Sequence, residues 1–160
     1  MTDAMKYLAG QFKLQTRLFN NVTAEVSEAD SKQSLNSNTN NMAWLAGHSV
    51  STRYMLAQIL GLSVSEPFPA LFANGKGLDK TAAYPSMSEL TNDWNTISAQ
   101  IETALNTLPA EALHNKMPQP VPTGDTLGDF LAFLMHHEAY TIGQLGLARR
   151  FYGLQAMTYN

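Results

Sequence analysis

Residues 126–154 read TLGDFLAFLMHHEAYTIGQLGLARRFYGL, and this stretch decides what kind of fold the chain adopts. Apolar residues recur in it every three or four positions, the spacing of a helix that turns one face to a protein core. Thr126 stands where an N-cap belongs, and Gly153 follows the last turn. The stretch therefore predicts one long amphipathic helix, with an inward row of Leu127, Leu131, Leu134, His137, Thr141, Leu145, Ala148 and Phe151.

Polar residues interrupt this inward row at His137 and Thr141, with Gln144 at its edge. A buried polar group costs free energy unless it finds a partner, so the interruption indicates where a functional site lies. His136 is about 100° around the helix from His137 and should be solvated. Glu138 lies beside the row. It is either a solvated glutamate on the helix face or a general base toward a metal-bound water.

Three further helices are predicted upstream, over residues 2–20, 40–60 and 86–108. The second repeats the pattern of the last, because its inward row also carries a single histidine; this row is Asn41, Leu45, His48, Thr52, Met55 and Ile59. Long loops at 61–85 and 114–125 predict crossover connections, the second extended and irregular because it contains three prolines. Four helices without an alternating strand pattern predict an all-α four-helix bundle, in one domain over residues 1–160.

Composition narrows the classes of partner. The 160 residues carry a net charge of −3 without a basic run, which argues against nucleic acid. No apolar run reaches the ~18 residues of a membrane span, so we expect a cytoplasmic protein. Without cysteine, disulfides and thiolate metal sites are impossible. Charged residues make up only 14%, which leaves room for the apolar surface of a homodimer.

The two inward histidines, His48 and His137, have two interpretations. The interior of a helix bundle is where helical proteins build metal sites, and neutral imidazole is a ligand for zinc, nickel and iron(II). Alternatively, each is a core histidine hydrogen-bonded to a hydroxyl or an amide. Asn41 is open in the same way, because it is either an N-cap or a group that orients an imidazole.

Two segments resemble the signatures of the DinB-like family. Residues 41–48, NMAWLAGH, are similar to its N-x-x-W-L-x-G-H motif, and residues 137–144, HEAYTIGQ, are similar to its H-E-x-Y-H-x-G-Q motif. The resemblance implies a four-helix bundle, often dimeric, with a divalent metal on three histidines. Carried over, the ligands are His48, His137 and, in place of the third histidine, Thr141.

The resemblance implies a metal-dependent enzyme, either a thiol-dependent transferase or isomerase or a hydrolase. Because a threonine hydroxyl is a poor ligand for zinc or nickel, the metal would be held by the two histidines and water. The alternative is a metal-free bundle that binds a small molecule or acts as a dimeric protein in a bacterial stress response. In either case, the residues expected to line the pocket or support the imidazoles are Asn41, Trp44, Tyr140 and Gln144.

Overall fold

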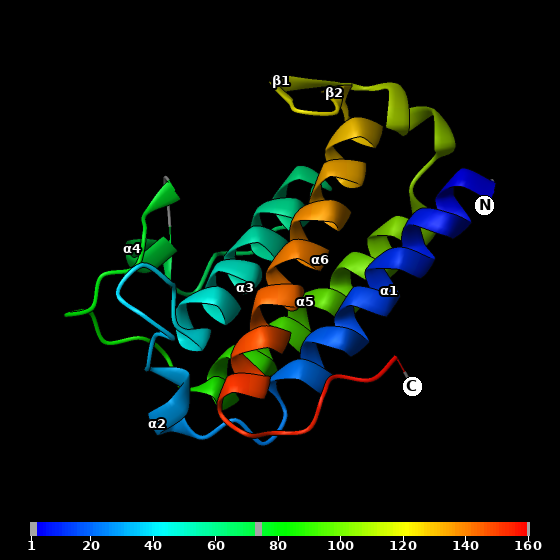
Figure 1. The fold of residues 1–160 in the computed structure, drawn as a ribbon. Coiled ribbons are helices and arrows are strands. Elements are labelled where there is room, and N and C mark those ends of the chain that lie inside the picture. Colours follow the sequence, from blue (N-terminus) through cyan, green and yellow to red (C-terminus); the bar gives the residue numbers. More distant parts are fainter. Residues whose placement is uncertain (1–2, 73–74, 160) are drawn as a thin grey trace.

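Four long helices lie side by side in the computed structural model, which describes residues 3–72 and 75–159 (Figure 1). They are α1 (Asp3–Thr23), α3 (Met42–Ile59), α5 (Met87–Thr107) and α6 (Leu127–Phe151). The shorter elements are α2 (Glu28–Ser31), α4 (Pro69–Phe72), the 3-10 turn η2 (Ala110–His114) and the strands β1 (Lys116–Val121) and β2 (Gly124–Thr126). The predicted all-α bundle is confirmed.

The four long helices form a ring. α1 packs against α5 and α6, and α3 packs against the same two helices. Figure 1 shows α1 and α6 running in one direction and α3 and α5 in the other. Residues 60–86 therefore carry the chain back along the length of the bundle, as the predicted crossover requires. Residues 108–126 instead fold at one end, beside the start of α6.

Side-chain caps begin three of the long helices. The Asn41 side chain accepts a hydrogen bond from the amide three residues on, at 2.8 Å, so the N-cap interpretation of this residue is confirmed. Ser86 with Glu89, and Thr126 with Asp129, form reciprocal capping boxes at α5 and α6. Each cap satisfies amides that have no partner inside the helix and so determines where the helix starts.

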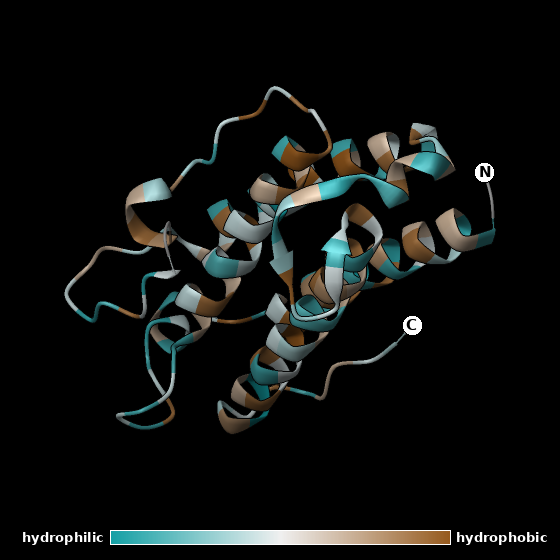
Figure 2. Cartoon of the chain, turned by 90° about the horizontal axis from the view of Figure 1, so that it is seen from above, coloured by the Kyte–Doolittle hydropathy of each residue, from teal (hydrophilic) through white to brown (hydrophobic). Residues whose placement is uncertain are grey.

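The core lies between the four helices. Each long helix in Figure 2 carries both hydrophobic and hydrophilic stretches, as helices around a shared core do. The buried side chains of all four join in one cluster, with Trp94 at 0% exposure among the largest. In the described part of the chain, no helix is both long and apolar enough to cross a membrane.

The predicted inward rows of α3 and α6 are wrong at their ends. Met55 is 44% exposed, Ile59 37% and Phe151 64%. Met55 lies about two turns beyond His48 on one line of α3, and this line, half-buried at His48, is exposed by the end of the helix. The buried side of α3 continues through Leu56 instead.

A β-hairpin replaces the irregular segment that the prolines predicted. β1 pairs with β2 in antiparallel register, with Lys116 opposite Thr126 and Val121 opposite Gly124. Prolines are tolerated because each strand of a two-stranded sheet is an edge strand, which has a free side without ladder hydrogen bonds. Gly124 has a φ of 150°, and a Cβ there would collide with the Asp129 carboxylate. Only glycine fits this turn.

Candidate functional site

His48 of α3 and His137 of α6 meet in the space between these two helices. The Nε2 atoms of His48 and His137 are 3.1 Å apart, and the ring planes are inclined at 61°. Both side chains are half-buried, whereas His136 is exposed, as predicted. Residues 89 positions apart in the chain thus meet at one point.

A cavity of about 260 Å³ opens at this histidine pair. Six of the predicted site residues line it. Tyr140 stands at its rim, with 65% of the residue exposed. Asn40 and Leu45 complete the wall, which comprises Asn40, Trp44, Leu45, His48, His137, Tyr140, Thr141 and Gln144. Asn41 and Glu138 are not part of the lining.

An aromatic ring supports each imidazole. Trp44 stacks on His48 with ring centroids 5.0 Å apart and planes at 5°, and Phe133 lies 6.0 Å from His137. The Nε1 of Trp44 is buried and has no hydrogen-bond partner among the described residues. These contacts restrict the rotation of the imidazoles and leave Trp44 with one donor to offer.

Phe72 of α4 packs edge-on against Trp44. Their ring centroids are 6.5 Å apart, and Phe72 is buried. A Cβ at Gly47 would overlap the Phe72 ring, so the glycine of the segment NMAWLAGH is the residue that makes room for it. The long loop after α3 is thereby fixed against the helix that carries His48.

Burial keeps both imidazoles in their neutral form. Loss of water around His48, followed by repulsion from His137, lowers its pKa to about 4. Burial also lowers the pKa of His137. The negative charge of Glu138 raises this pKa in part, and repulsion from His136 lowers it further. Both rings are then neutral at neutral pH, and a hydrogen bond between the two Nε2 atoms requires one ring to carry its proton on Nε2 and the other on Nδ1.

Thr141 occupies the position one turn beyond His137. It is buried, and its hydroxyl donates to the His137 carbonyl at 3.0 Å. This is the usual bond of a threonine inside a helix, so the hydroxyl proton is directed to the backbone. Its oxygen lines the cavity as a neutral acceptor.

Glu138 lies in the core, so its prediction as a solvated residue is wrong. Its side chain is 1% exposed, and its two oxygens accept from Nε and Nη2 of Arg53 at 2.8 and 2.9 Å. The Arg53 side chain is equally buried, with its guanidinium 3.7 Å from the Trp94 ring centroid. Such a bidentate pair satisfies both charges, and it leaves Glu138 pointing away from the cavity.

Arg53 is a residue that the sequence analysis missed. It also donates to Thr16 Oγ1 at 2.6 Å, to Ser98 Oγ at 2.5 Å and to the Phe12 carbonyl at 3.2 Å. One guanidinium therefore bridges α1, α3, α5 and, through Glu138, α6. The signal was present, because Arg53 is the single charged residue within α3.

Asn41 is occupied in supporting the chain rather than an imidazole. Its oxygen caps α3, and its amide donates to the Lys32 carbonyl at 3.1 Å. Its neighbour Asn40 lines the cavity instead. Gln144, two turns beyond His137, is the predicted supporting residue that does reach the cavity wall.

Of the three residues expected to hold a metal ion, His48 and His137 are spaced suitably for one. Two nitrogens bound to one tetrahedral zinc ion at about 2.0–2.1 Å lie roughly 3.3 Å apart. The separation of His48 Nε2 and His137 Nε2 is 3.1 Å. The third position does not fit, because the neutral Thr141 hydroxyl, whose proton is directed to the His137 carbonyl, is a poor ligand for zinc or nickel beside imidazole. Within residues 3–72 and 75–159, no group of three or more His, Asp or Glu side chains could hold a metal ion.

Comparison with known proteins identifies the family. The family model of the DinB superfamily matches residues 11–145, a range that includes both histidines and the Arg53–Glu138 pair. A conserved protein from Enterococcus faecalis has a similar crystal structure, with a TM-score of 0.66 over 94% of this chain and 97% of that one. Its sequence identity is 12%, so the likeness concerns the fold alone. No curated protein gave a significant match. The chain belongs to the DinB superfamily.

Proposed function

We propose that the cavity between α3 and α6 binds a small molecule through His48 and His137 without a resident metal ion. The observation that carries this proposal is the direct contact of the two neutral imidazoles at 3.1 Å. A ligand that separates them can accept a hydrogen bond from one Nε2 and donate to the other. The cavity, of about 260 Å³, suits a small, uncharged polar molecule that packs on Trp44.

The partners of the neighbouring polar groups support the metal-free site. The hydroxyl of Thr141 donates to the backbone, and both oxygens of Glu138 accept from Arg53. Glu138 cannot complete a metal site without losing a buried hydrogen bond, and Thr141 offers only a neutral hydroxyl oxygen, which is a poor metal ligand. Tyr140 and Gln144 at the cavity wall remain available to the ligand.

The spacing of the imidazole nitrogens favours a second candidate, a metal-dependent transferase or hydrolase. His48 and His137 would hold a divalent ion, and the chemistry supplied by such an ion is to lower the pKa of a bound water or thiol. A general-base role for Glu138 would require this carboxylate to leave Arg53, which would then be a buried charge without a counter-charge.

Metal content separates the two candidates. Tag-free protein, purified without chelators, is analysed by mass spectrometry before and after incubation with excess zinc, nickel or iron(II). We expect no stoichiometric metal. Near-stoichiometric metal that is lost in His48→Ala and retained in His136→Ala would contradict the proposal and support the metal-dependent enzyme. His136→Ala is the matched control because it removes a neighbouring, exposed histidine.

Ligand binding is tested by adding a library of small polar molecules and recording amide NMR shifts. We expect shifts around the cavity in the wild type and in His136→Ala, and none in His48→Ala.

Thr141→His tests the arrangement of the site itself, because it places a third imidazole one turn from His137. It should raise zinc affinity at least about tenfold. An unchanged affinity would show that α3 and α6 do not direct these side chains to one point.

A further inference from the structure

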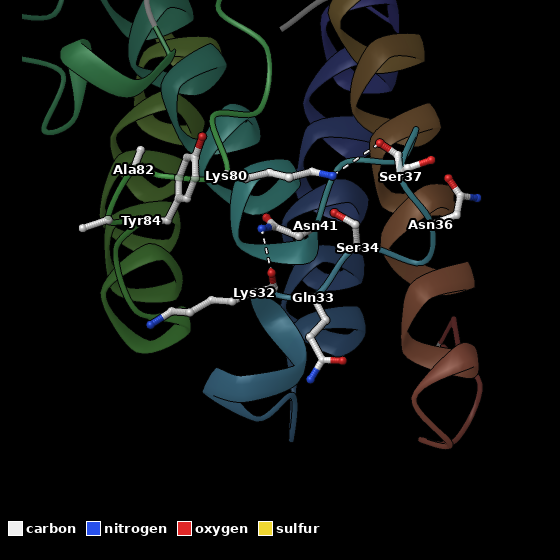
Figure 3. Close-up of a pocket in the computed structure, with 10 residues that line it drawn as sticks. Lys32, Gln33, Ser34, Asn36, Ser37, Asn41, Lys80, Ala82 and Tyr84 are labelled. Atoms are coloured by element: carbon white, nitrogen blue, oxygen red, sulfur yellow. Dashed lines mark hydrogen bonds between the residues drawn. The ribbon is translucent and has the colours of Figure 1, made fainter.

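A second cavity, of about 550 Å³, lies between residues 32–41 and residues 80–84 (Figure 3). Its volume is about twice that of the histidine cavity and falls within the range of small-molecule sites. Asn41 contributes to its wall, whereas the adjacent Asn40 lines the histidine cavity. The two cavities share no lining residue, and both border the start of α3.

The described residues that line this second cavity carry positive charge only. Lys32 and Lys80 are among them, and no Asp or Glu is. The chain as a whole has a net charge of −3, so the cavity is a local exception. Figure 3 shows the Lys80 side chain reaching from the 80–84 segment toward Ser37, while the Lys32 side chain extends in the opposite direction below it. The two ammonium groups thus stand at opposite edges.

Both ammonium groups are weakly paired. The Lys80 Nζ is 3.5 Å from the Ser37 carbonyl. The Lys32 Nζ is 4.0 Å from one Glu28 oxygen, and the other Glu28 oxygen accepts from the Met87 amide at 2.8 Å. Exposed pairs of this length contribute little free energy, so an anion of the right size can replace these contacts at small cost.

The rest of the lining is neutral and mixed. The Ser34 side chain in Figure 3 points toward Asn41, and Gln33 adds an amide at the lower edge. Ala82 and the Tyr84 ring supply an apolar side wall. Hydroxyl and amide groups hydrogen-bond polar substituents, and the ring provides a flat surface for an apolar body.

We propose that this cavity is a binding site for a small organic anion that carries phosphate or carboxylate groups at both ends, one beside Lys32 and one beside Lys80. Ammonium groups bind phosphate and carboxylate oxygens as point charges, through hydrogen bonds strengthened by charge. The neutral side chains then contact the remainder of the ligand. Because none of the lining residues belongs to the histidine pair, this site is independent of the function proposed above.

The test is calorimetric titration of the full chain with pyrophosphate and, separately, with citrate at low ionic strength. We expect saturable binding of at least one probe; the responding probe identifies phosphate or carboxylate as the preferred group. Lys32→Ala and Lys80→Ala should each weaken binding at least about fivefold. Lys13→Ala removes the same charge from an exposed position on α1 and should change affinity less than about twofold.

Three results would overturn this anion site. The first is the absence of saturable binding by both probes in the wild type. The second is an equal loss of affinity in Lys13→Ala, which would indicate diffuse attraction by surface charge. The third is a loss of affinity in His48→Ala. Amide NMR shifts should concentrate at Ser34, Ser37 and Tyr84. His48→Ala should bind the probe with unchanged affinity, and a loss there would show that the anion occupies the histidine cavity instead.

Discussion

At the scale of single residues, His48 makes the stability of the bundle depend on pH. Its pKa is lowered to about 4 in the folded protein, and it is about 6.5 in an unfolded chain. Between these values the unfolded state binds more protons, so the free energy of unfolding rises with pH. The contribution is fully present above pH ~6.5 and is lost as the pH falls toward ~4.

We therefore expect the wild type to lose roughly 2 kcal/mol of stability between about pH 6.5 and pH 4.5. His48→Gln should reduce this dependence and leave the contribution of His137, while His136→Gln, an exposed control, should preserve it. Urea unfolding at several pH values measures the slope. The carboxylates of Asp79, Glu89 and Asp129 have lowered pKa values and act at lower pH, whereas the lowered pKa of His137 adds to the slope and the raised pKa of Asp93 opposes it. An unchanged slope in His48→Gln would assign the effect elsewhere.

Gly47 is a second residue whose role follows from its surroundings. An added Cβ would overlap the Phe72 ring, so Gly47→Ala must displace this buried side chain. We expect a loss of about 1–3 kcal/mol, the usual cost of overpacking. Gly10→Ala is the matched control, because a Cβ at this helical glycine meets no atom within 4 Å. That variant should gain up to about 1 kcal/mol from helix propensity. Equal stabilities in urea would contradict the packing argument.

At the scale of elements, the capping box determines where α6 begins. The Thr126 hydroxyl accepts from the Asp129 amide at 3.2 Å and donates to its carboxylate at 2.7 Å. Thr126→Ala removes both bonds and should cost about 1 kcal/mol. Hydrogen bonds from Thr126 lower the Asp129 pKa, so this pKa should also rise toward its usual value, which carbon NMR measures. Thr126→Ser, which keeps the hydroxyl, should change neither quantity appreciably.

At the scale of the whole molecule, Arg53 joins all four long helices. A buried ion pair contributes little net stability, but the removal of one partner leaves a buried charge uncompensated. We expect Arg53→Met and Glu138→Gln each to cost about 3–5 kcal/mol. The double variant should lose less than the sum of the two, by ~1 kcal/mol or more. Denaturant unfolding of the four proteins completes the cycle.

The exposed ion pair between Lys13 and Glu102 is the control for this cycle, with 3.7 Å between its charged atoms. Glu102→Gln should change stability by at most about 1 kcal/mol, because water screens the pair. Strict additivity of the Arg53 and Glu138 variants would mean that the two side chains do not stabilise each other. The proposal that the Arg53–Glu138 pair joins α3 to α6 would then be wrong.

Much of the element structure could be read from local pattern. The three-and-four spacing of apolar residues predicted all four long helices, and the caps at Asn41, Ser86 and Thr126 determined where three of them begin. Local pattern failed for the hairpin, because prolines indicate an irregular segment unless the pairing partner is known. It also failed at Met55, since a row on one helix does not reveal where its neighbours stop covering it.

The sequence by itself determined the bundle, its family motifs and the inward direction of His48 and His137 on their separate helices. These follow from periodicity and residue type, which are local properties of the chain. Only the tertiary structure decided that Glu138 belongs to Arg53, that Phe72 needs Gly47, and that Lys32 and Lys80 border one cavity. Each of these depends on a contact between distant segments of the chain. Such contacts are determined by how packed helices rotate relative to one another and by the path of a long loop.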